Sequence, residues 1–181
     1  CKYNNIQTKL TGTLGFYKNN KKVKNSSLTT PSNLELYQFA YSNKKNNDFF
    51  ISEASSHGLH QGRYNNLNID VAAITNLSHD HLDYHKTFKS YVESKMLLFT
   101  KVLNKNGIAV INSRLKNYKY FVSKIKSRNI KLITFGSKDV FFTQTKYLNL
   151  NIFGKKYFIK DLKLNTIQKE NLECAIACAL A

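Results

Sequence analysis

Residues 70–75 read Asp-Val-Ala-Ala-Ile-Thr, a nearly continuous apolar run. Such a run is typical of a parallel strand that is buried on both faces of a sheet. A helical pattern follows at residues 87–103, and Asn106-Gly107 then predicts a turn into a strand at residues 108–111. This alternation predicts an α/β domain with a mainly parallel sheet that is flanked by helices and joined by right-handed crossovers.

The rest of the chain extends this pattern. Residues 141–159 predict a small antiparallel hairpin that turns at Phe153-Gly154-Lys155. Thr30 before Pro31 is typical of a helix N-cap, and the polar residues 18–27 are typical of a loop. Further elements are strands at residues 9–16, 49–51 (expected to be buried) and 130–135, and helices at residues 31–39, 116–126 and 168–181. With 181 residues, the chain is long enough for one domain, residues 1–181.

The composition is globular, with 42% hydrophobic residues, but the net charge is +17. One interpretation is a basic nucleic-acid-binding module whose lysines contact phosphates. We favour a general over-use of Lys and Asn, because the Lys pairs lie in separate turn-like stretches, and we expect neither a nucleic-acid nor a membrane partner. The sequence has no signal-peptide pattern and no membrane-spanning run, which predicts a cytoplasmic protein. Cys174 and Cys178 are expected to be small buried apolar residues.

All five histidines fall between residues 57 and 85. Residues 53–63 directly follow one predicted strand, and residues 76–85 directly follow another. Two adjacent strand ends would bring Glu53 and the second loop to one crevice. Because carboxylate and imidazole groups bind divalent cations, the sequence predicts a metal site there.

One alternative is a zinc-dependent hydrolase, because His79-x-His81-x-Asp83 is similar to the start of a metallo-β-lactamase-type motif. That motif needs a histidine immediately after the aspartate, but Tyr84 stands there and His85 comes one residue late. It also needs histidines further downstream, and the sequence has none after His85. Zinc hydrolysis is therefore the weaker hypothesis.

The same segment resembles the middle domain of the Mur ligases, in particular of their tripeptide-forming members. The resemblance rests on Glu53-Ala-Ser-Ser-His57-Gly-Leu-x-Gln61-Gly-Arg63 and on Thr75-Asn-Leu-Ser-x-Asp80-His81-Leu-Asp83-Tyr-His85. Weaker matches flank these two motifs, at residues 12–15, 28–31, 94–99 and 109–112. The resemblance covers essentially the whole chain and implies an α/β fold like that of the P-loop NTPases.

By this resemblance, the protein is an ATP-dependent ligase of peptidoglycan precursor synthesis. It would join meso-diaminopimelate or L-lysine to UDP-N-acetylmuramoyl-L-alanyl-D-glutamate through an acyl phosphate. Such chemistry depends mainly on positioning and charge neutralisation. The resemblance implies that Glu53 and His81 hold Mg²⁺, and that Lys95 is N6-carboxylated, which would turn a cation into a carboxylate-like metal ligand. Lys95 and His81 would thus be catalytic.

Other residues match ligand-binding positions of the family. Hydroxyl, amide and guanidinium groups suit the carbonyl and carboxylate oxygens of the muramoyl dipeptide, and the matching residues are Thr29, Thr30, Ser55, Gln61 and Arg63. Gln168 and Asn171 match the start of the helix that contacts the adenine of ATP. The chain departs from the family at Gln168 (often Asn), at Asn165 (usually Gly) and at Asn112-Ser-Arg114-Leu115 (usually Asn-x-Asp-Asp).

Two parts of such an enzyme are not found in the sequence. Its seven glycines do not form the phosphate-binding pattern Gly-x-x-x-x-Gly-Lys-[Ser/Thr], which the family carries upstream of the first strand. The family's C-terminal domain, which selects the amino acid, has no counterpart either. We therefore expect a monomeric middle domain, truncated at both ends, that cannot turn over alone.

Overall fold

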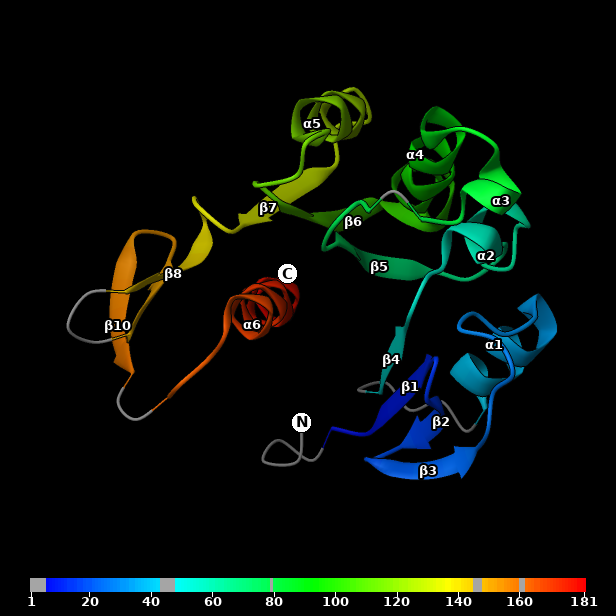
Figure 1. Ribbon diagram of the computed structural model, residues 1–181. Coiled ribbons are helices and arrows are strands. Elements are labelled where there is room, and N and C mark those ends of the chain that lie inside the picture. The colour runs from blue at the N-terminus through cyan, green and yellow to red at the C-terminus, as the bar shows by residue number, and fades with distance from the viewer. Residues whose placement is uncertain (1–5, 43–47, 79, 145–147, 160–161) are drawn as a thin grey trace. The chain divides into compact units, whose positions relative to one another are not determined.

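The computed structural model describes residues 6–42, 48–78, 80–144, 148–159 and 162–181. The chain forms two compact units (Figure 1). The first unit combines Cys1–Leu67 with His81–Val102, and the second combines Asn68–Asp80 with Leu103–Ala181. The chain enters the second unit at Asn68, returns to the first unit at His81 and leaves it again at Leu103, and the single domain expected over residues 1–181 stays a prediction.

The first unit contains a four-stranded sheet in the order β3-β2-β1-β4. Strands β1 and β4 are parallel, whereas the β1–β2 and β2–β3 pairs are antiparallel. The predicted strand at residues 9–16 is confirmed only as far as Gly12, because the chain turns back at Thr13-Leu14 and a second strand begins at Gly15, whose φ of +110° suits glycine. The predicted loop at residues 18–27 is also wrong in part, since an exposed edge strand lies within it. The strands are β1 (Thr8–Gly12), β2 (Gly15–Lys18), β3 (Lys21–Lys24) and β4 (Phe49–Ser52).

Strand β4 confirms the predicted position of a strand but not its predicted burial. Phe49 is 55% exposed and Ile51 is 52% exposed. The reason is that β4 lies at the edge of its sheet, with β1 as its hydrogen-bonded neighbour. A strand that is buried on both faces needs cover on each side, and burial therefore depends on tertiary packing that the apolar run does not specify.

Among its described residues, the first unit also has five helical segments. The capping residue of α1 is Ser32 and not Thr30, because the Ser32 side chain accepts from Glu35 N while the Glu35 side chain accepts from Ser32 N. The predicted helix at residues 87–103 is confirmed as α4 followed by a π-helical turn. The segments are α1 (Asn33–Tyr41), α2 (Ser56–His60), α3 (Leu82–His85), α4 (Phe88–Leu97) and η2 (Leu98–Val102).

The second unit contains a six-stranded mixed sheet in the order β10-β9-β8-β7-β6-β5. Pairs from β5 to β8 are parallel, and β8–β9 and β9–β10 are antiparallel. This confirms the α/β fold class, although the predicted hairpin is a three-stranded meander. The strands are β5 (Ile69–Ile74), β6 (Leu103–Asn112), β7 (Lys131–Phe135), β8 (Val140–Gln144), β9 (Leu148–Ile152) and β10 (Lys155–Ile159).

The predicted turn at Asn106-Gly107 lies inside strand β6. The pairing with β5 jumps there from Ile69↔Leu103 to Val71↔Ile108, so residues 104–107 bulge out of the ladder. Asn104 Nδ2 donates to Asp70 Oδ1 at 2.8 Å and anchors the bulge. The turn signal therefore marked a real irregularity, but the strand continues on both sides of it.

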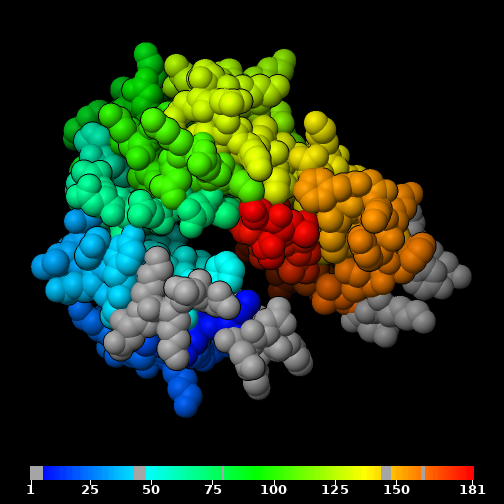
Figure 2. Space-filling view, turned by 180° about the vertical axis from the view of Figure 1, so that it is seen from behind, coloured from blue at the N-terminus to red at the C-terminus, as the bar shows by residue number. Residues whose placement is uncertain are grey.

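Helices α5 (Tyr118–Lys126) and α6 (Thr166–Ala179) lie on opposite sides of the β6–β7 pair (Figure 1). Figure 2 shows α6, in red, against the yellow and orange strands of this sheet. The core between α6 and the sheet includes Val110, Phe135, Val140 and Ala177, all fully buried. Cys174 is buried as predicted, whereas Cys178, which we also expected to be buried, is only partly so. None of the helices in the described ranges is long and apolar enough to cross a membrane.

Candidate functional site

The carboxylate of Glu53 lies at the end of strand β4, in the first unit. Glu53 Oε2 accepts hydrogen bonds from the backbone N and the Oγ1 of Thr13, each at 3.1 Å. Gly12 is needed beside it, because a Cβ there would lie 2.9 Å from Glu53 Oε2. A pocket of about 250 Å³ opens at this end of the sheet, lined by residues 10–14 and 51–53. The predicted metal-binding carboxylate is therefore oriented by the β1–β2 turn and borders an open pocket.

Thr30 braces the backbone under Glu53. Its hydroxyl donates to the Glu53 carbonyl and accepts from Ser55 N, both at 2.9 Å. Thr30 as a whole is only 1% exposed. Tyr64 also donates from its hydroxyl to the Glu53 carbonyl, at 2.9 Å, and burial raises the pKa of Tyr64. Because the Thr30 hydroxyl already has two internal partners, the structure gives it a bracing role.

Thr29 and Ser55 are both neighbours of Thr30: Thr29 precedes it in the sequence, and Ser55 N donates to its hydroxyl. Thr29 Oγ1 lies 3.0 Å from Thr13 Oγ1, so it belongs to the hydroxyl group around the Glu53 carboxylate. Ser55 is the N-cap of α2, and its Oγ accepts from Gly58 N at 3.1 Å. Both side chains are half-buried. They keep some contact with solvent, which Thr30 does not.

Gln61 and Arg63 form a hydrogen-bonded pair after α2. Arg63 Nε donates to Gln61 Oε1 at 3.0 Å, and Arg63 Nη2 donates to the same oxygen. Arg63 Nη1 donates to the Thr30 carbonyl, which fixes the third side of the guanidinium. Gln61 Nε2 donates to the Tyr84 hydroxyl at 3.2 Å. The pair is thus connected both to the brace under Glu53 and to α3.

Four histidines and Tyr84 pack together between α2, α3 and α4. The His57 ring lies 4.8 Å from the ring of His81 and 4.1 Å from that of Tyr84, measured between centroids. Burial lowers the pKa of His57, and the positive charge of His81 lowers it further. His60 contributes through the edge of its ring, 5.6 Å from Tyr84. The cluster therefore favours neutral imidazole at His57, beside an exposed His81.

His85 is the buried member of this cluster, at 5% exposed. Its Nδ1 lies 3.3 Å from Ser94 Oγ, while its Nε2 has no hydrogen-bond partner among the described residues. Burial is the main cause that lowers the pKa of His85. Burial thus disfavours the charged form of His85, whose ring packs against those of His57 and Tyr84.

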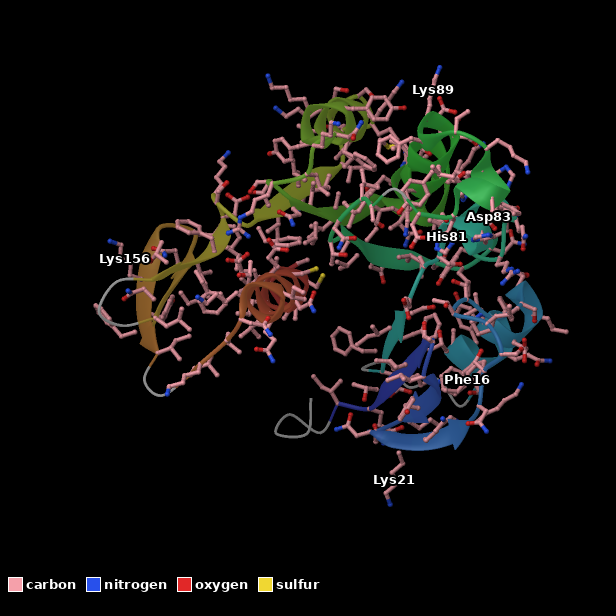
Figure 3. The ribbon with its side chains drawn as sticks, viewed as in Figure 1. Phe16, Lys21, His81, Asp83, Lys89 and Lys156 are labelled. Atoms are coloured by element: carbon pink, nitrogen blue, oxygen red, sulfur yellow. The ribbon has the colours of Figure 1, made fainter. Side chains whose placement is uncertain are left out.

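Lys95 lies beside the residue that follows Glu53, and His81 belongs to the same compact unit. His81 adopts a left-handed backbone (φ 59°) that turns the chain into α3, where Figure 3 shows it beside Asp83. Lys95 extends from α4, and its Nζ lies 3.4 Å from the carbonyl of Ala54, the residue after Glu53. The chain's return to the first unit at His81 brings these groups to the unit that contains Glu53.

The expected arrangement of the two loops needs a correction. Strands β4 and β5 belong to different sheets and are not neighbours, so the two loops do not meet at one sheet edge as we predicted. Within the described part of the chain, no three His, Cys, Asp or Glu side chains converge as a metal site. His79, which the zinc hypothesis requires, lies outside the described residues. A set of Glu53, His81 and a modified Lys95 would contain only two such side chains.

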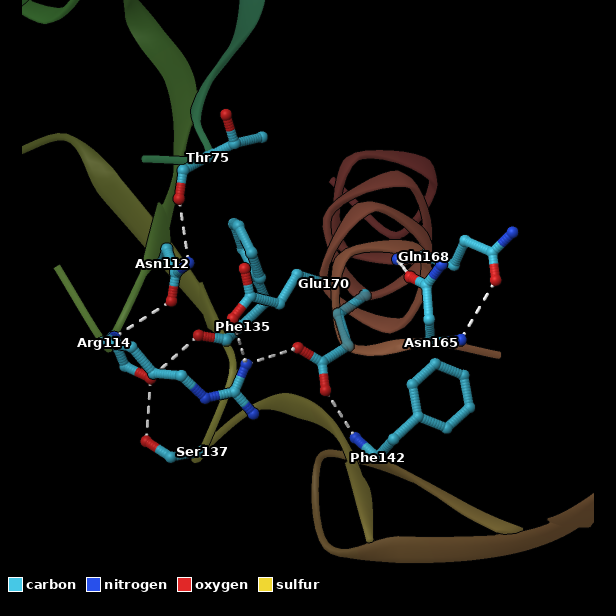
Figure 4. Close-up of polar contacts among 11 residues, drawn as sticks. Thr75, Asn112, Arg114, Phe135, Ser137, Phe142, Asn165, Gln168 and Glu170 are labelled. Atoms are coloured by element: carbon cyan, nitrogen blue, oxygen red, sulfur yellow. Dashed lines mark hydrogen bonds and ion pairs between the residues drawn. The ribbon is translucent and has the colours of Figure 1, made fainter. Parts of the chain in front are cut away.

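The expected adenine contacts lie in the second unit, at the start of α6. Asn165 is the N-cap and forms a capping box with Gln168: Gln168 N donates to Asn165 Oδ1 at 2.9 Å, and Asn165 N donates to Gln168 Oε1 at 3.0 Å (Figure 4). The two residues that depart from the expected family pattern thus cap the helix reciprocally. Asn171, one turn further along, is exposed.

Two functional elements escaped the sequence interpretation. Tyr84 served there only as the residue that breaks the zinc motif, yet it contacts Gln61 and His60 through its hydroxyl. Glu173 is buried in the second unit and binds Arg114. Both links join residues far apart in sequence, so local spacing contains no signal for them.

Comparison with known proteins identifies the family. The Mur ligase middle domain family model matches residues 2–181. A UDP-N-acetylmuramoyl-L-alanyl-D-glutamate–2,6-diaminopimelate ligase of Rickettsia conorii is 32% identical over 157 residues, which cover 82% of this chain and 33% of the relative. The ligase of the same name from Rickettsia bellii is 37% identical over 153 residues, covering 80% and 32%. The chain spans about a third of the length of these relatives.

Solved structures agree with this assignment. A UDP-N-acetylmuramoyl-L-alanyl-D-glutamate–2,6-diaminopimelate ligase has a TM-score of 0.78 and 27% identity, covering 99% of this chain and 38% of that one. The MurF ligase of Thermotoga maritima, in complex with ADP, has the same fold, with a TM-score of 0.65, 16% identity, and coverage of 96% and 39%. These relatives give no support to a zinc hydrolase or a nucleic-acid-binding module. The chain belongs to the Mur ligase middle domain family.

Proposed function

We propose that the protein containing this chain is a cytoplasmic, ATP-dependent ligase that adds diaminopimelate to UDP-N-acetylmuramoyl-L-alanyl-D-glutamate. The names of the Rickettsia relatives support diaminopimelate, and L-lysine is the second candidate. The observation that carries the proposal is that one compact unit contains the Glu53 carboxylate, the Gln61–Arg63 pair and the His81 loop. The reaction needs an anion-binding fork and a metal-binding group close to each other, and this unit has both types of group.

The Gln61–Arg63 pair and its neighbours suit the anionic dipeptide. A guanidinium has five N–H donors, and among the described residues three of those of Arg63 have partners. One N–H on each terminal nitrogen is left for a ligand, which is the geometry of bidentate carboxylate binding. Thr29 and Ser55 add half-buried hydroxyls around Glu53. We propose that these four side chains orient the dipeptide, and that Thr30 holds them in place.

The residues around Glu53 fit a divalent cation. Glu53 offers a hard carboxylate oxygen and His81 an exposed imidazole, both ligand types for such ions. Lys95 Nζ lies beside the backbone of Ala54, so a carboxyl group added to it would supply a second anionic oxygen ligand there. When bound, Mg²⁺ would neutralise the charge that develops on the phosphate groups. The chain's own contribution is to fix the Glu53 carboxylate through Thr13 and its carbonyl through Thr30 and Tyr64.

In the second unit, we propose that Asn171 and the side-chain amide nitrogen of Gln168, which takes no part in the capping box, contact the adenine of ATP. Gln168 uses only its Oε1 in the capping box, so its Nε2 can donate to a ring nitrogen. The capping box fixes the side chain at the helix start, where a ligand would meet it without further ordering.

The test is a ligation assay on the full-length protein with UDP-N-acetylmuramoyl-L-alanyl-D-glutamate, ATP and Mg²⁺. Diaminopimelate and L-lysine are supplied separately, and UDP-N-acetylmuramoyl-tripeptide is measured by mass spectrometry together with released phosphate. We expect product with diaminopimelate, in a one-to-one ratio with phosphate. Absence of product with both amino acids would overturn the proposal. Product with lysine alone would change the amino acid and leave the reaction class intact.

A further inference from the structure

The orientation of the Gln61 amide follows from the chemistry of its neighbours. Arg63 has only donors, and two of its nitrogens contact Gln61 Oε1, so that atom must be the carbonyl oxygen. The other end of the amide is then Nε2, which can only donate. It contacts the Tyr84 hydroxyl at 3.2 Å, and that hydroxyl oxygen must therefore accept.

The Tyr84 hydroxyl thereby becomes a fixed link between two side chains. Since its oxygen accepts from Gln61, its own proton is available for His60 Nδ1, which lies 2.9 Å away. His60 Nδ1 must then be an acceptor, so the neutral imidazole has its proton on Nε2. A series of hydrogen bonds thus runs from His60 through Tyr84 and Gln61 to Arg63 and ends at the Thr30 carbonyl. In each of these bonds one partner can donate and the other can accept.

Tyr84 is itself held firmly. Its ring packs on His57 at 4.1 Å between centroids and meets His85 edge-on at 4.8 Å. It also lies in α3, the helical turn that starts directly after His81. The hydroxyl therefore presents a stationary partner to Gln61, whereas an exposed glutamine without such a partner would sample several rotamers.

We propose that Tyr84 is a positioning residue for the muramoyl-dipeptide site: its hydroxyl fixes the Gln61 amide, which in turn fixes the Arg63 guanidinium for bidentate binding of a carboxylate. This inference rests on the proposed function. Because α3 follows His81 without an intervening residue, the same tyrosine connects the carboxylate fork to the loop that supplies the imidazole. Tyr84 acts through Gln61 and needs no contact of its own with substrate.

The experiment replaces the hydroxyl and keeps the ring. Tyr84→Phe in the full-length enzyme should raise the KM for the UDP-muramoyl dipeptide about five- to tenfold, the usual consequence of losing one hydrogen bond. The KM for ATP and kcat should stay within about twofold, because the fork binds ground state and transition state alike. The matched control is Tyr120→Phe on α5, which removes an exposed hydroxyl in the second unit and should change none of these constants.

A double-mutant cycle separates positioning from general loosening of the fold. In a Gln61→Ala background, Tyr84→Phe should have no further effect on that KM, because its target is gone. The proposal would be overturned if Tyr84→Phe raised the KM for the muramoyl dipeptide as much in the Gln61→Ala background as in the wild type. It would also be overturned if Tyr84→Phe lowered kcat and left that KM unchanged. A second readout does not depend on activity: ¹⁵N NMR should show His60 protonated on Nε2 in the wild type and altered by Tyr84→Phe. A Nδ1-protonated His60 would overturn the proposed bonding.

The proposed function and the positioning role of Tyr84 can fail separately. If the wild type makes no tripeptide, the proposed function falls, and the positioning role falls with it. If the wild type makes tripeptide and Tyr84→Phe has the same kcat and KM values as the wild type, only the positioning role is refuted.

Discussion

The guanidinium of Arg114 lies 3.1 Å from the carboxylate of Glu173, a side chain that is only 1% exposed. Glu173 also accepts from Phe142 N at 2.7 Å, and Arg114 reaches Glu170 at 3.4 Å. Arg114 stands in the segment Asn112-Ser-Arg114-Leu115, where the resemblance led us to expect an acidic pair. A basic residue there meets two acidic residues of α6, so the loop after β6 is connected to the helix that carries the expected adenine contacts.

Removal of Arg114 should therefore destabilise the second unit. Arg114→Leu leaves the buried Glu173 carboxylate with only one backbone donor, and we expect a loss of about 2 kcal/mol in the free energy of unfolding. The value lies below that of a fully buried pair because Arg114 is 43% exposed. Urea denaturation of the full chain measures it.

Lys24–Glu35 serves as the control for this ion pair. Its side chains are 58% and 40% exposed, so Lys24→Ala should cost less than about 1 kcal/mol. Equal losses for Arg114→Leu and Lys24→Ala would contradict the special role given to the buried carboxylate.

Gly58 allows α2 to approach Thr30, and a methyl group should break that contact. A Cβ at residue 58 would lie 2.6 Å from Thr30 Cγ2, far inside van der Waals contact. Gly58→Ala should displace Thr30 from the Glu53 carbonyl and Ser55 N, at a cost of about 1–3 kcal/mol in unfolding free energy. The KM for the muramoyl dipeptide should rise as well. Thr30 Cβ and Oγ1 would also lie only 2.8 and 3.0 Å from the added Cβ, so the clash involves the whole Thr30 side chain. An unfolding free energy and a KM in Gly58→Ala equal to those of the wild type would argue against the clash.

The sequence predicted most elements of the second unit but not the arrangement of the first. Strands β5 to β7 were predictable because each is an apolar run between helical segments, and parallel pairing follows from that order. Strand β3 was not, because Lys21, Lys22 and Lys24 make an exposed edge strand look like a loop. The chain's exchange between the units at Asn68 and His81 has no local signal, so β4 and β5 were wrongly expected to be neighbours.

The residues of the candidate site could be predicted from the sequence, but the contacts between them could not. Its residues could be named in advance because Glu53, His57, Gln61 and Arg63 stand in one short motif after a strand. The contacts that orient them could not, since Thr13, Thr30 and Tyr84 come from three other segments. Such contacts depend on tertiary packing, and periodicity in a single sequence contains no information about which distant side chains meet.

Buried histidines should make stability depend on pH. The pKa of His85 lies below its ordinary value of 6.5, and that of His57 does too, chiefly because burial disfavours the charged ring. The unfolded chain therefore binds protons first as the pH falls. The free energy of unfolding should be highest above pH 6.5 and should fall as the pH drops below 6.5. It should become constant again below the pKa values that His57 and His85 have in the folded protein.

Each histidine can contribute at most about 1.4 kcal/mol per pH unit to this decline. Urea midpoints between pH 7.5 and 5 measure it, and a His85→Gln variant should show a shallower slope. A wild-type midpoint that is constant across this range, or one that rises as the pH falls, would contradict the burial argument.

Removal of the His81 imidazole or the Lys95 amine should abolish ligation while the fold persists. His81 is exposed and Lys95 is half-buried at the surface of the site, so His81→Ala and Lys95→Ala should change the unfolding free energy by less than about 1 kcal/mol. The turnover number should fall at least about a hundredfold, since each variant would lose a proposed metal ligand.

Lys95 adds a sharper prediction, because only its N6-carboxylated form would be a metal ligand. Labelled bicarbonate should give a carbamate ¹³C signal in the wild type that Lys95→Ala lacks, and Lys101→Ala, an exposed neighbour in the same helical segment, should retain it. Normal turnover by His81→Ala, or the same carbamate signal in Lys95→Ala, would remove these residues from the proposed site.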